Sequence, residues 1–270
     1  MISAMPTDER SPGTPRPNVS LMIPALNEER RIGATLDTVL AVAARQPGLR
    51  LEILVVDDGS ADNTAWIASD YAKRHPSVRL IRHPSNRGLG QAFRTALAYA
   101  TSEKFLIVPG DNDMPASTLG ALLSHAATAD MVMCFFLNRE QRGRTRNVLS
   151  TLFSLIYATS FDIYVQYING PCVYPVARLR DLQLISTRFS IVAEINVKLL
   201  RQGASFLEVP SYRQTGLTGS SSFSLRNLME TVSIFCRLFY EVHFKSRSRY
   251  AHRPVRVMPV STSPVPSALD

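Results

Sequence analysis

Short apolar runs alternate along the chain with segments in which apolar residues recur every three to four positions. The runs lie at 19–23, 51–56, 78–81, 105–108 and 131–137, and Pro24, Asp57 and Pro109 follow the first, second and fourth of them. The periodic segments between them predict helices, among them 61–75, 86–100 and 119–127. Strands that alternate with helices predict an α/β fold, with a mostly parallel sheet and helices on both faces.

Polar clusters follow four of these predicted strands within a few residues. They are Asn27-Glu28, Asp57-Asp58, the stretch from Asn86 to Gly90, and the stretch from Asp111 to Asp113. In a sheet of this kind a ligand binds outside the carboxyl ends of the strands. A solvated loop would explain any one cluster, but four at the same edge of the sheet predict a ligand site there.

Asp111 and Asp113 stand one residue apart, after a buried run that ends in Pro109-Gly110. Carboxylates this close raise each other's pKa unless a cation lies between them. Oxygen ligands suit Mg²⁺ or Mn²⁺, especially where a diphosphate supplies the remaining ligands. The alternative is an ordinary turn, because Asp and Asn are common turn residues.

The character of the chain changes after the last of these strands. Four arginines crowd into eight residues: Arg139, Arg142, Arg144 and Arg146. One interpretation is a solvated basic loop, as most charge runs are. The other is a clamp for a phosphate group, since arginine presents a planar fork of donors.

Two amphipathic helices are predicted beyond this point. The first carries Leu149, Leu152, Phe153, Ile156 and Tyr157 on one side, and the second spans 225–244, bordered by Arg237, His243 and Lys245. Such helices suit a protein that lies on an anionic membrane surface. The alternative is that both pack on the sheet or on a second copy of the chain, which would make a homo-oligomer. Asp162 interrupts the nearest candidate for a membrane-spanning run, so a buried or interfacial helix is expected there.

Composition bounds the organisation and the partners. The 270 residues suffice for one domain, expected at 19–245, between disordered tails at 1–18 and 246–270. The formal net charge of +8 favours an anionic partner. Nucleic acid is disfavoured because no reader motif is present, and no GxGxxG follows the first strand to indicate a dinucleotide oxidoreductase. Three widely spaced cysteines and the lack of an apolar leader favour a reduced, cytoplasmic location.

The motifs together resemble a known family. The order Pro24-Ala25-Leu26-Asn27-Glu28, Asp57-Asp58-Gly59-Ser60, Gly88-Leu89-Gly90 and Asp111-Asn112-Asp113 resembles the family 2 glycosyltransferases, which have the Rossmann-like GT-A fold. Later segments resemble the dolichyl- and polyprenyl-phosphate sugar synthases: 189–200, Gly203, Glu208-Val209-Pro210, Arg213 and Gly216. The resemblance covers about 19–244.

For the donor half, the resemblance implies a nucleotide-sugar site. Pro24, Leu26 and Glu28 would line the base pocket, with Leu26 standing where the family usually has Tyr. Asp58 would bind the base with Asp57 beside it, and Gly88 and Gly90 would let the backbone approach the sugar nucleotide. Asp111 and Asp113 would hold Mg²⁺ or Mn²⁺ on the diphosphate.

For the acceptor half, the resemblance implies a lipid phosphate bound at the inner face of a membrane. Arg146 and Ser150 would grip its phosphate, with Arg213 as a second cation. Three departures put the acceptor in question: Gln166 stands in place of Asp, Pro171-Cys172 in place of Phe-Arg, and Ser222 near an expected Lys.

The expected reaction is sugar transfer with inversion. A lipid phosphate is already ionised and needs no general base, which agrees with the lack of histidine in the motif set. If the acceptor were instead a hydroxyl of a polysaccharide or small molecule, a carboxylate base would be required, with Glu194 or Asp113 as candidates. A nucleotide-binding protein without turnover is the alternative outside the enzymes.

Overall fold

The computed structural model describes residues 18–138, 144–188, 190–212 and 225–258. Residues 1–17 of the first predicted tail and residues 259–270 of the second lie outside these ranges. So do five positions singled out in the sequence: Arg139, Arg142, Arg213, Gly216 and Ser222.

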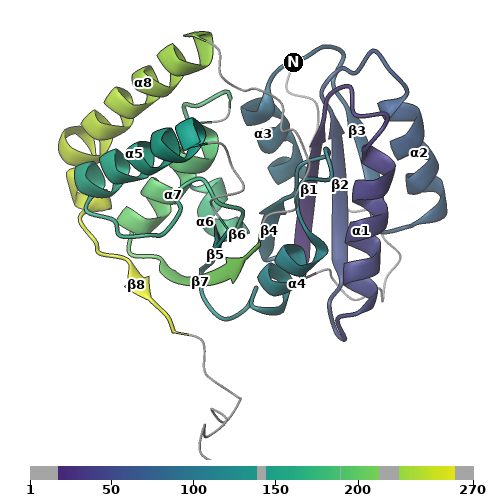
Figure 1. Cartoon of the computed structure of the whole chain (residues 1–270), viewed down its shortest axis with the longest axis horizontal. Helices are drawn as coiled ribbons and strands as arrows, with labels where there is room; N and C mark the ends of the chain where they lie inside the picture. Colours follow the sequence, from purple (N-terminus) through teal and green to yellow (C-terminus); the bar gives the residue numbers. More distant parts are fainter. Residues whose placement is uncertain (1–17, 139–143, 189, 213–224, 259–270) are drawn as a thin grey trace, which may run out of the picture.

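One sheet of eight strands organises the described part of the chain (Figure 1). The strands are β1 (Val19–Ala25), β2 (Leu51–Asp57), β3 (Val78–Arg82), β4 (Lys104–Ile107), β5 (Met131–Phe136), β6 (Cys172–Pro175), β7 (Ser205–Ser211) and β8 (Val255–Arg256). Their order across the sheet is β3-β2-β1-β4-β6-β5-β7-β8. Within it β6 runs antiparallel to β4 and β5, and the other pairs are parallel, so the predicted α/β class is confirmed.

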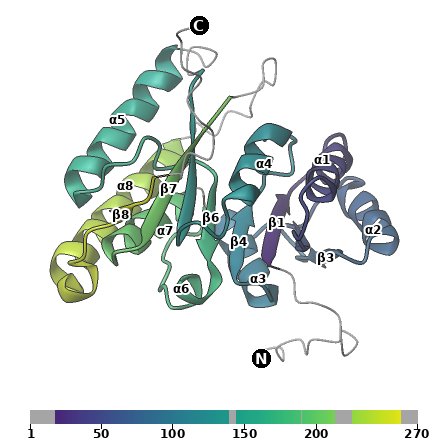
Figure 2. The ribbon, with the colours of Figure 1, turned by 90° about the horizontal axis from the view of Figure 1, so that it is seen from below.

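Both faces of the sheet are buried, because successive side chains of a strand point to opposite faces. In β1, Leu21 and Ile23 join one core while Met22 joins the other. The first core is covered by α1 (Ile32–Ala44), α2 (Thr64–Arg74) and α4 (Ala116–Ser124). The second is covered by α3 (Leu89–Tyr99), α5 (Arg144–Phe161), α6 (Val176–Arg180), α7 (Ile191–Arg201) and α8 (Leu225–Tyr240). Figure 2 shows α1 and α4 on one side of the strands and α3 and α6 on the other.

The helices α5 and α8 lie side by side through a cluster of aromatic rings. Phe235 of α8 meets Tyr157 and Phe161 of α5 edge-on, with ring centroids 5.3 Å and 5.7 Å apart. The apolar side predicted for α5 is therefore only partly covered: Tyr157 is buried, whereas Leu152 is 50% exposed. Within the described ranges, no helix combines the length and the apolar character needed to cross a membrane.

The prediction of disorder after residue 245 is wrong for 246–258. A π-helical turn (Glu241–Lys245) continues α8, and a 3₁₀ turn (Arg247–Tyr250) leads to β8, which pairs with β7. Tyr250 anchors the segment, since its ring is buried and its hydroxyl donates to Glu241 at 3.0 Å. The polar composition of this segment gave no sign of its ordered structure. One aromatic side chain and backbone pairing hold the segment in place, and it has no periodic apolar pattern.

Candidate functional site

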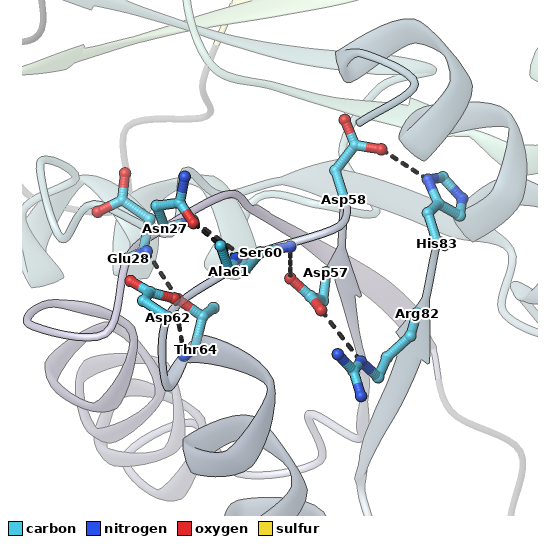
Figure 3. A network of polar contacts seen from close by, with 10 residues as sticks. All are labelled: Asn27, Glu28, Asp57, Asp58, Ser60, Ala61, Asp62, Thr64, Arg82 and His83. Carbon is cyan, nitrogen blue, oxygen red and sulfur yellow. Dashed lines mark hydrogen bonds and ion pairs between the residues drawn. The ribbon is translucent and has the colours of Figure 1, made fainter. Parts of the chain in front are cut away.

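The loops after β1 and β2 are fastened together at the carboxyl edge of the sheet (Figure 3). Asn27 has a left-handed φ of 56°, and its side-chain oxygen accepts the N–H of Ala61 at 2.9 Å. Its own N–H donates to Ser60 Oγ at 3.0 Å. The N–H of Glu28 donates to Thr64 Oγ1 at 2.7 Å. These bonds fix Glu28 beside the acidic loop that follows β2.

Pro24 and Leu26 lie at the same corner. Pro24 is the last residue but one of β1 and pairs in register with Val56, and Ala25 pairs with Asp57. Leu26 follows the strand with 37% of its side chain exposed. Their role in lining a base pocket stays a prediction.

Asp57 is fully buried at the end of β2. One of its oxygens accepts the N–H of Ser60 at 3.0 Å, and the other lies 3.2 Å from Arg82 Nε. The carboxylate therefore shapes the turn after β2 and ties it to β3.

Asp58 holds the loop that connects β3 to α3. Its carboxylate accepts the backbone N–H groups of Arg87 and Gly88 at 2.9 Å and 2.8 Å, and it lies 2.7 Å from His83 Nδ1. The other ring nitrogen of His83 lies 3.0 Å from Thr95 Oγ1. The sequence analysis missed His83 as a site residue. The available signal was its position directly after the strand 78–81, at the edge where the other polar clusters lie.

Gly88 and Gly90 meet the protein's own backbone. A Cβ at Gly90 would lie 2.6 Å from Thr187 Cα, and one at Gly88 would lie 2.8 Å from the Thr187 carbonyl oxygen. The N–H of Gly90 donates to that same carbonyl at 2.9 Å. These glycines therefore permit a close approach to residue 187, and their predicted approach to a sugar nucleotide stays a prediction.

The acidic turn after β4 is held by β1 and α1. Gly110 is close enough to β1 that a Cβ there would lie 2.9 Å from the Pro24 carbonyl oxygen, and its own carbonyl accepts Thr35 Oγ1 at 3.0 Å. Asn112 has a left-handed φ of 56°. The N–H of Asp113 donates to Asp111 Oδ1 at 3.2 Å. The turn thus presents two half-buried carboxylates at the centre of the sheet edge.

Glu28 adds a third carboxylate to this corner. Burial raises its pKa above the ordinary value, and the neighbouring Asp111 raises it further, while Arg31 at 3.0 Å acts in the opposite direction. The electrostatic influence of Asp111 shows that the loops after β1 and β4 bring their negative charges near each other.

The residues present fit a hard divalent cation. Asp111 and Asp113 offer oxygen donors alone, the ligand type that Mg²⁺ and Mn²⁺ prefer. The pKa of Glu28 is raised mainly by burial of its carboxyl group, with a smaller contribution from the negative charge of Asp111. Among the described residues, no three His, Cys, Asp or Glu side chains form a metal-binding group. A cation here would therefore take further ligands from a diphosphate and water.

The described positions of the acceptor half lie on α5, on β6 and between these two elements. Arg146 and Ser150 lie four residues apart on α5, which places them on one face of that helix. The backbone N–H of Gln166 donates to Glu208 Oε1 at 2.6 Å, so Gln166 borders β7. Cys172 is buried within β6. None of these contacts tests the predicted grip on a phosphate.

Glu194 is fully buried in α7 and is occupied by the protein itself. Its carboxylate accepts the N–H groups of Ile185 and Ser186 at 2.9 Å and 2.8 Å and pairs with Lys198 at 2.9 Å. A general base must reach the proton that it removes. The structure therefore argues against Glu194 as the base for a hydroxyl acceptor.

The mostly parallel sheet and the acidic turn at its carboxyl edge define a GT-A type of nucleotide-binding fold. The model for glycosyl transferase family 2 matches residues 20–189, and the chain belongs to this family. The predicted resemblance to dolichyl-phosphate sugar synthases is confirmed by similar proteins named dolichyl-phosphate beta-glucosyltransferase. The chain is 40% identical over 96 residues to dolichyl-phosphate beta-glucosyltransferase ALG5C of Trichomonas vaginalis, covering 34% of this chain and 28% of the relative.

The human dolichyl-phosphate beta-glucosyltransferase is 35% identical over 104 residues, covering 36% of this chain and 32% of the relative. The chain thus matches about a third of the length of these curated relatives. Solved structures show the fold over a longer range. Glucosyl-3-phosphoglycerate synthase from Mycobacterium tuberculosis, in complex with Mn²⁺, UDP and phosphoglyceric acid, superposes with a TM-score of 0.60 at 18% identity, covering 83% of this chain and 78% of the other. Mannosyltransferase PcManGT from Pyrobaculum calidifontis, in complex with GDP-Man and Mn²⁺, gives 0.60 at 21% identity, covering 85% and 65%.

Proposed function

We propose that this protein transfers a sugar, with inversion, from a nucleoside-diphosphate donor to a lipid phosphate at a membrane surface. The observation that carries the proposal is the acidic turn 111–113 beside Glu28, where β1 and β4 end. Relatives named for dolichyl phosphate and structures of this fold that hold UDP or GDP-Man with Mn²⁺ support it.

On the donor side, Pro24, Leu26 and Glu28 would line the base pocket, with Asp57 and Asp58 shaping its floor. Asp111 and Asp113 would hold the divalent ion against the diphosphate. When bound, that ion would stabilise the negative charge that develops on the diphosphate as the bond to the sugar breaks.

On the acceptor side, a phosphate is the better fit. A phosphate oxygen is ionised at neutral pH, so it can attack the anomeric carbon without a base, and the buried Glu194 is not available as one. Arg146, Ser150 and Arg213 would neutralise and orient the phosphate. Transfer to a hydroxyl, with Asp113 as base, is the second candidate.

The membrane part of the proposal rests on side chains that α5 and α8 leave exposed. Their large exposed apolar residues are Val148, Leu149, Leu152, Leu155 and Ile156 on α5, and Met229, Val232, Phe239 and Tyr240 on α8. On each helix the spacing of three to four residues gathers them on one side. Exposed basic residues adjoin them, including Arg237 and Lys245. This combination suits an anionic, cytoplasm-facing leaflet.

A panel of donors tests the donor half. Purified protein is melted with UDP-glucose, GDP-mannose and matched nucleotides, with and without Mn²⁺. We expect one nucleotide to raise the melting temperature in a metal-dependent way, because a ligand that binds the folded state stabilises it. Failure of every UDP and GDP ligand to shift the melting temperature would reject the donor assignment.

A comparison of acceptors tests the other half. The donor found in the panel is incubated with dolichyl phosphate, and in parallel with free dolichol as the hydroxyl control. Transfer to the phosphate, reduced at least tenfold by Arg146→Ala while nucleotide binding is kept, is the expected result. Transfer to dolichol alone would favour the hydroxyl candidate.

Sedimentation with vesicles tests the membrane surface. Vesicles of phosphatidylcholine with phosphatidylserine should bind the protein, and added salt should weaken the binding because salt screens the basic residues. The double variant Leu152→Ser, Leu155→Ser should bind at least fivefold more weakly. Equal binding by wild type and double variant would contradict the assignment of α5 to the membrane.

A further inference from the structure

The segment 183–187 connects α6 to α7 without regular secondary structure, yet its backbone is held closely by charged side chains. Gln183, Ile185 and Thr187 of this segment are exposed, so water could satisfy many of its backbone polar groups. Several of these groups instead bind two buried residues of α7 and an arginine of α3.

Lys198 provides the first of these contacts. Its side chain is fully buried, and its ammonium group donates to the carbonyl oxygen of Gln183 at 2.6 Å. The same group lies 2.9 Å from Glu194 and 2.9 Å from Glu241. An ammonium group has three donors, so Lys198 is fully satisfied by one backbone carbonyl and two carboxylates.

Glu194 provides the second. Besides Lys198, its two oxygens accept the N–H groups of Ile185 and Ser186. Both the carboxylate and the ammonium group thus bind consecutive parts of the same segment. Burying such an ion pair is a poor source of stability, since the desolvation of the two charges offsets most of their attraction.

The far side of the segment binds α3. Arg94 donates to the carbonyl oxygens of Leu184 and Ser186 at 2.6 Å and 3.0 Å. The carbonyl of Thr187 takes the N–H of Gly90 in the first turn of α3. That turn continues directly from Arg87 and Gly88, whose N–H groups bind Asp58. A continuous set of contacts therefore runs from α7 to the loop between β3 and α3, which Asp58 binds.

We propose that Glu194 and Lys198 are positioning residues for the donor site. They hold 183–187 against the first turn of α3 and so fix the loop 83–90 that Asp58 binds. The link to the donor rests on the proposed function, whereas the link to loop 83–90 rests on the contacts alone. The network also reaches α8 and its π-helical extension, because Glu230 lies 3.4 Å from Ser186 Oγ and Glu241 binds Lys198.

Amide hydrogen exchange tests the positioning without any ligand. Glu194→Gln keeps the size of the side chain and removes its charge, and Arg94→Met removes the two hydrogen bonds that the Arg94 side chain donates to the segment. In both variants we expect exchange in the peptide 84–92 to become at least tenfold faster. The matched control is Arg79→Met, which loses a cation–π contact of 4.4 Å with Tyr99 of the same helix but no contact with the segment.

If Glu194→Gln does not fold, Arg94→Met decides the question, because it buries no unpaired charge. A folded Arg94→Met protein whose 84–92 exchange equals that of wild type would overturn the proposal. So would an equal acceleration in Arg79→Met, since that would show a general loss of stability in α3.

Calorimetry with UDP or GDP and Mn²⁺ tests the link to the donor. Arg94→Met should weaken nucleotide binding at least tenfold, Arg94→Lys should recover part of the loss, and Arg79→Met should bind as wild type does. If wild type binds neither nucleotide, the proposed function fails while the exchange experiment still decides the positioning. Unchanged nucleotide affinity in a variant with accelerated exchange would confine the role of the network to the fold.

Discussion

Asp111 and Glu28 bring like charges to one corner of the sheet edge, from two different loops. Under the proposed function, a divalent cation held by Asp111 and Asp113 would offset this unfavourable arrangement of negative charges. Replacing Asp111 should affect activity, and replacing Glu28 should affect stability.

Asp111→Asn should lower kcat/KM for transfer by about 100-fold or more, equivalent to about 2.7 kcal/mol of transition-state stabilisation. It should also weaken Mn²⁺ binding measured in the presence of the nucleotide. Asp70→Asn is the control, because Asp70 is an exposed carboxylate of α2 paired with Arg74 at 2.6 Å. Activity of Asp111→Asn within twofold of wild type would remove the metal role from this residue.

Glu28→Gln should raise the melting temperature near neutral pH. The pKa of Glu28 is raised above 4.5 in the folded protein, so the folded state holds the proton more tightly than the unfolded chain does. Ionisation then reduces stability as the pH rises above that value. Melting curves from pH 4 to 7 should show a gain for the variant that grows with pH, together with weaker nucleotide binding. A variant less stable than wild type at pH 7 would contradict this.

Among the helices, α3 has a glycine, Gly90, at a position where the packing against residue 187 leaves no room for a side chain. Alanine normally stabilises a helix relative to glycine. At Gly90, however, the added Cβ would be forced against the backbone of Thr187.

Gly90→Ala should therefore reduce the free energy of unfolding by about 2 kcal/mol, the range found for overpacking. Gly120→Ala on α4 is the matched control, since its Cβ would make ordinary contacts at 3.7 Å and 4.0 Å. It should add about 0.5–1 kcal/mol. Urea denaturation measures both, and a gain in stability for Gly90→Ala would show that the segment 183–187 yields easily.

Some strands of the sheet could be predicted from the sequence and others could not. The strands β1 to β5 are short and mostly apolar, and polar clusters follow the first four, so their existence and their shared edge could be predicted. The antiparallel insertion of β6 could not, because its partners β4 and β5 come from distant parts of the chain. His83 and the segment 183–187 were missed for the same reason: their roles come from contacts with residues far away in the sequence.

At the scale of the whole molecule, the C-terminal segment completes the sheet. β8 covers one end of the β7 edge, and Arg256 pairs with Glu208 of β7 at 2.6 Å. Uncovered strand edges promote association between chains.

Ending the chain after residue 246 should therefore lower the melting temperature by several degrees and increase aggregation, measured by calorimetry and light scattering. Ending it after residue 258 is the control, because that chain keeps every described contact. Equal melting temperatures for the two truncated chains would show that Tyr250 and β8 contribute little.

The position of β6 in the sheet also affects how the protein is made. The strands β1 to β4 are complete once residue 107 has left the ribosome, but the strand that flanks β4 on its other side comes only with residues 172–175. At ordinary rates of synthesis this interval lasts several seconds. During that time the nascent chain leaves one edge of β4 without its strand partner, while the other edge can already pair with β1.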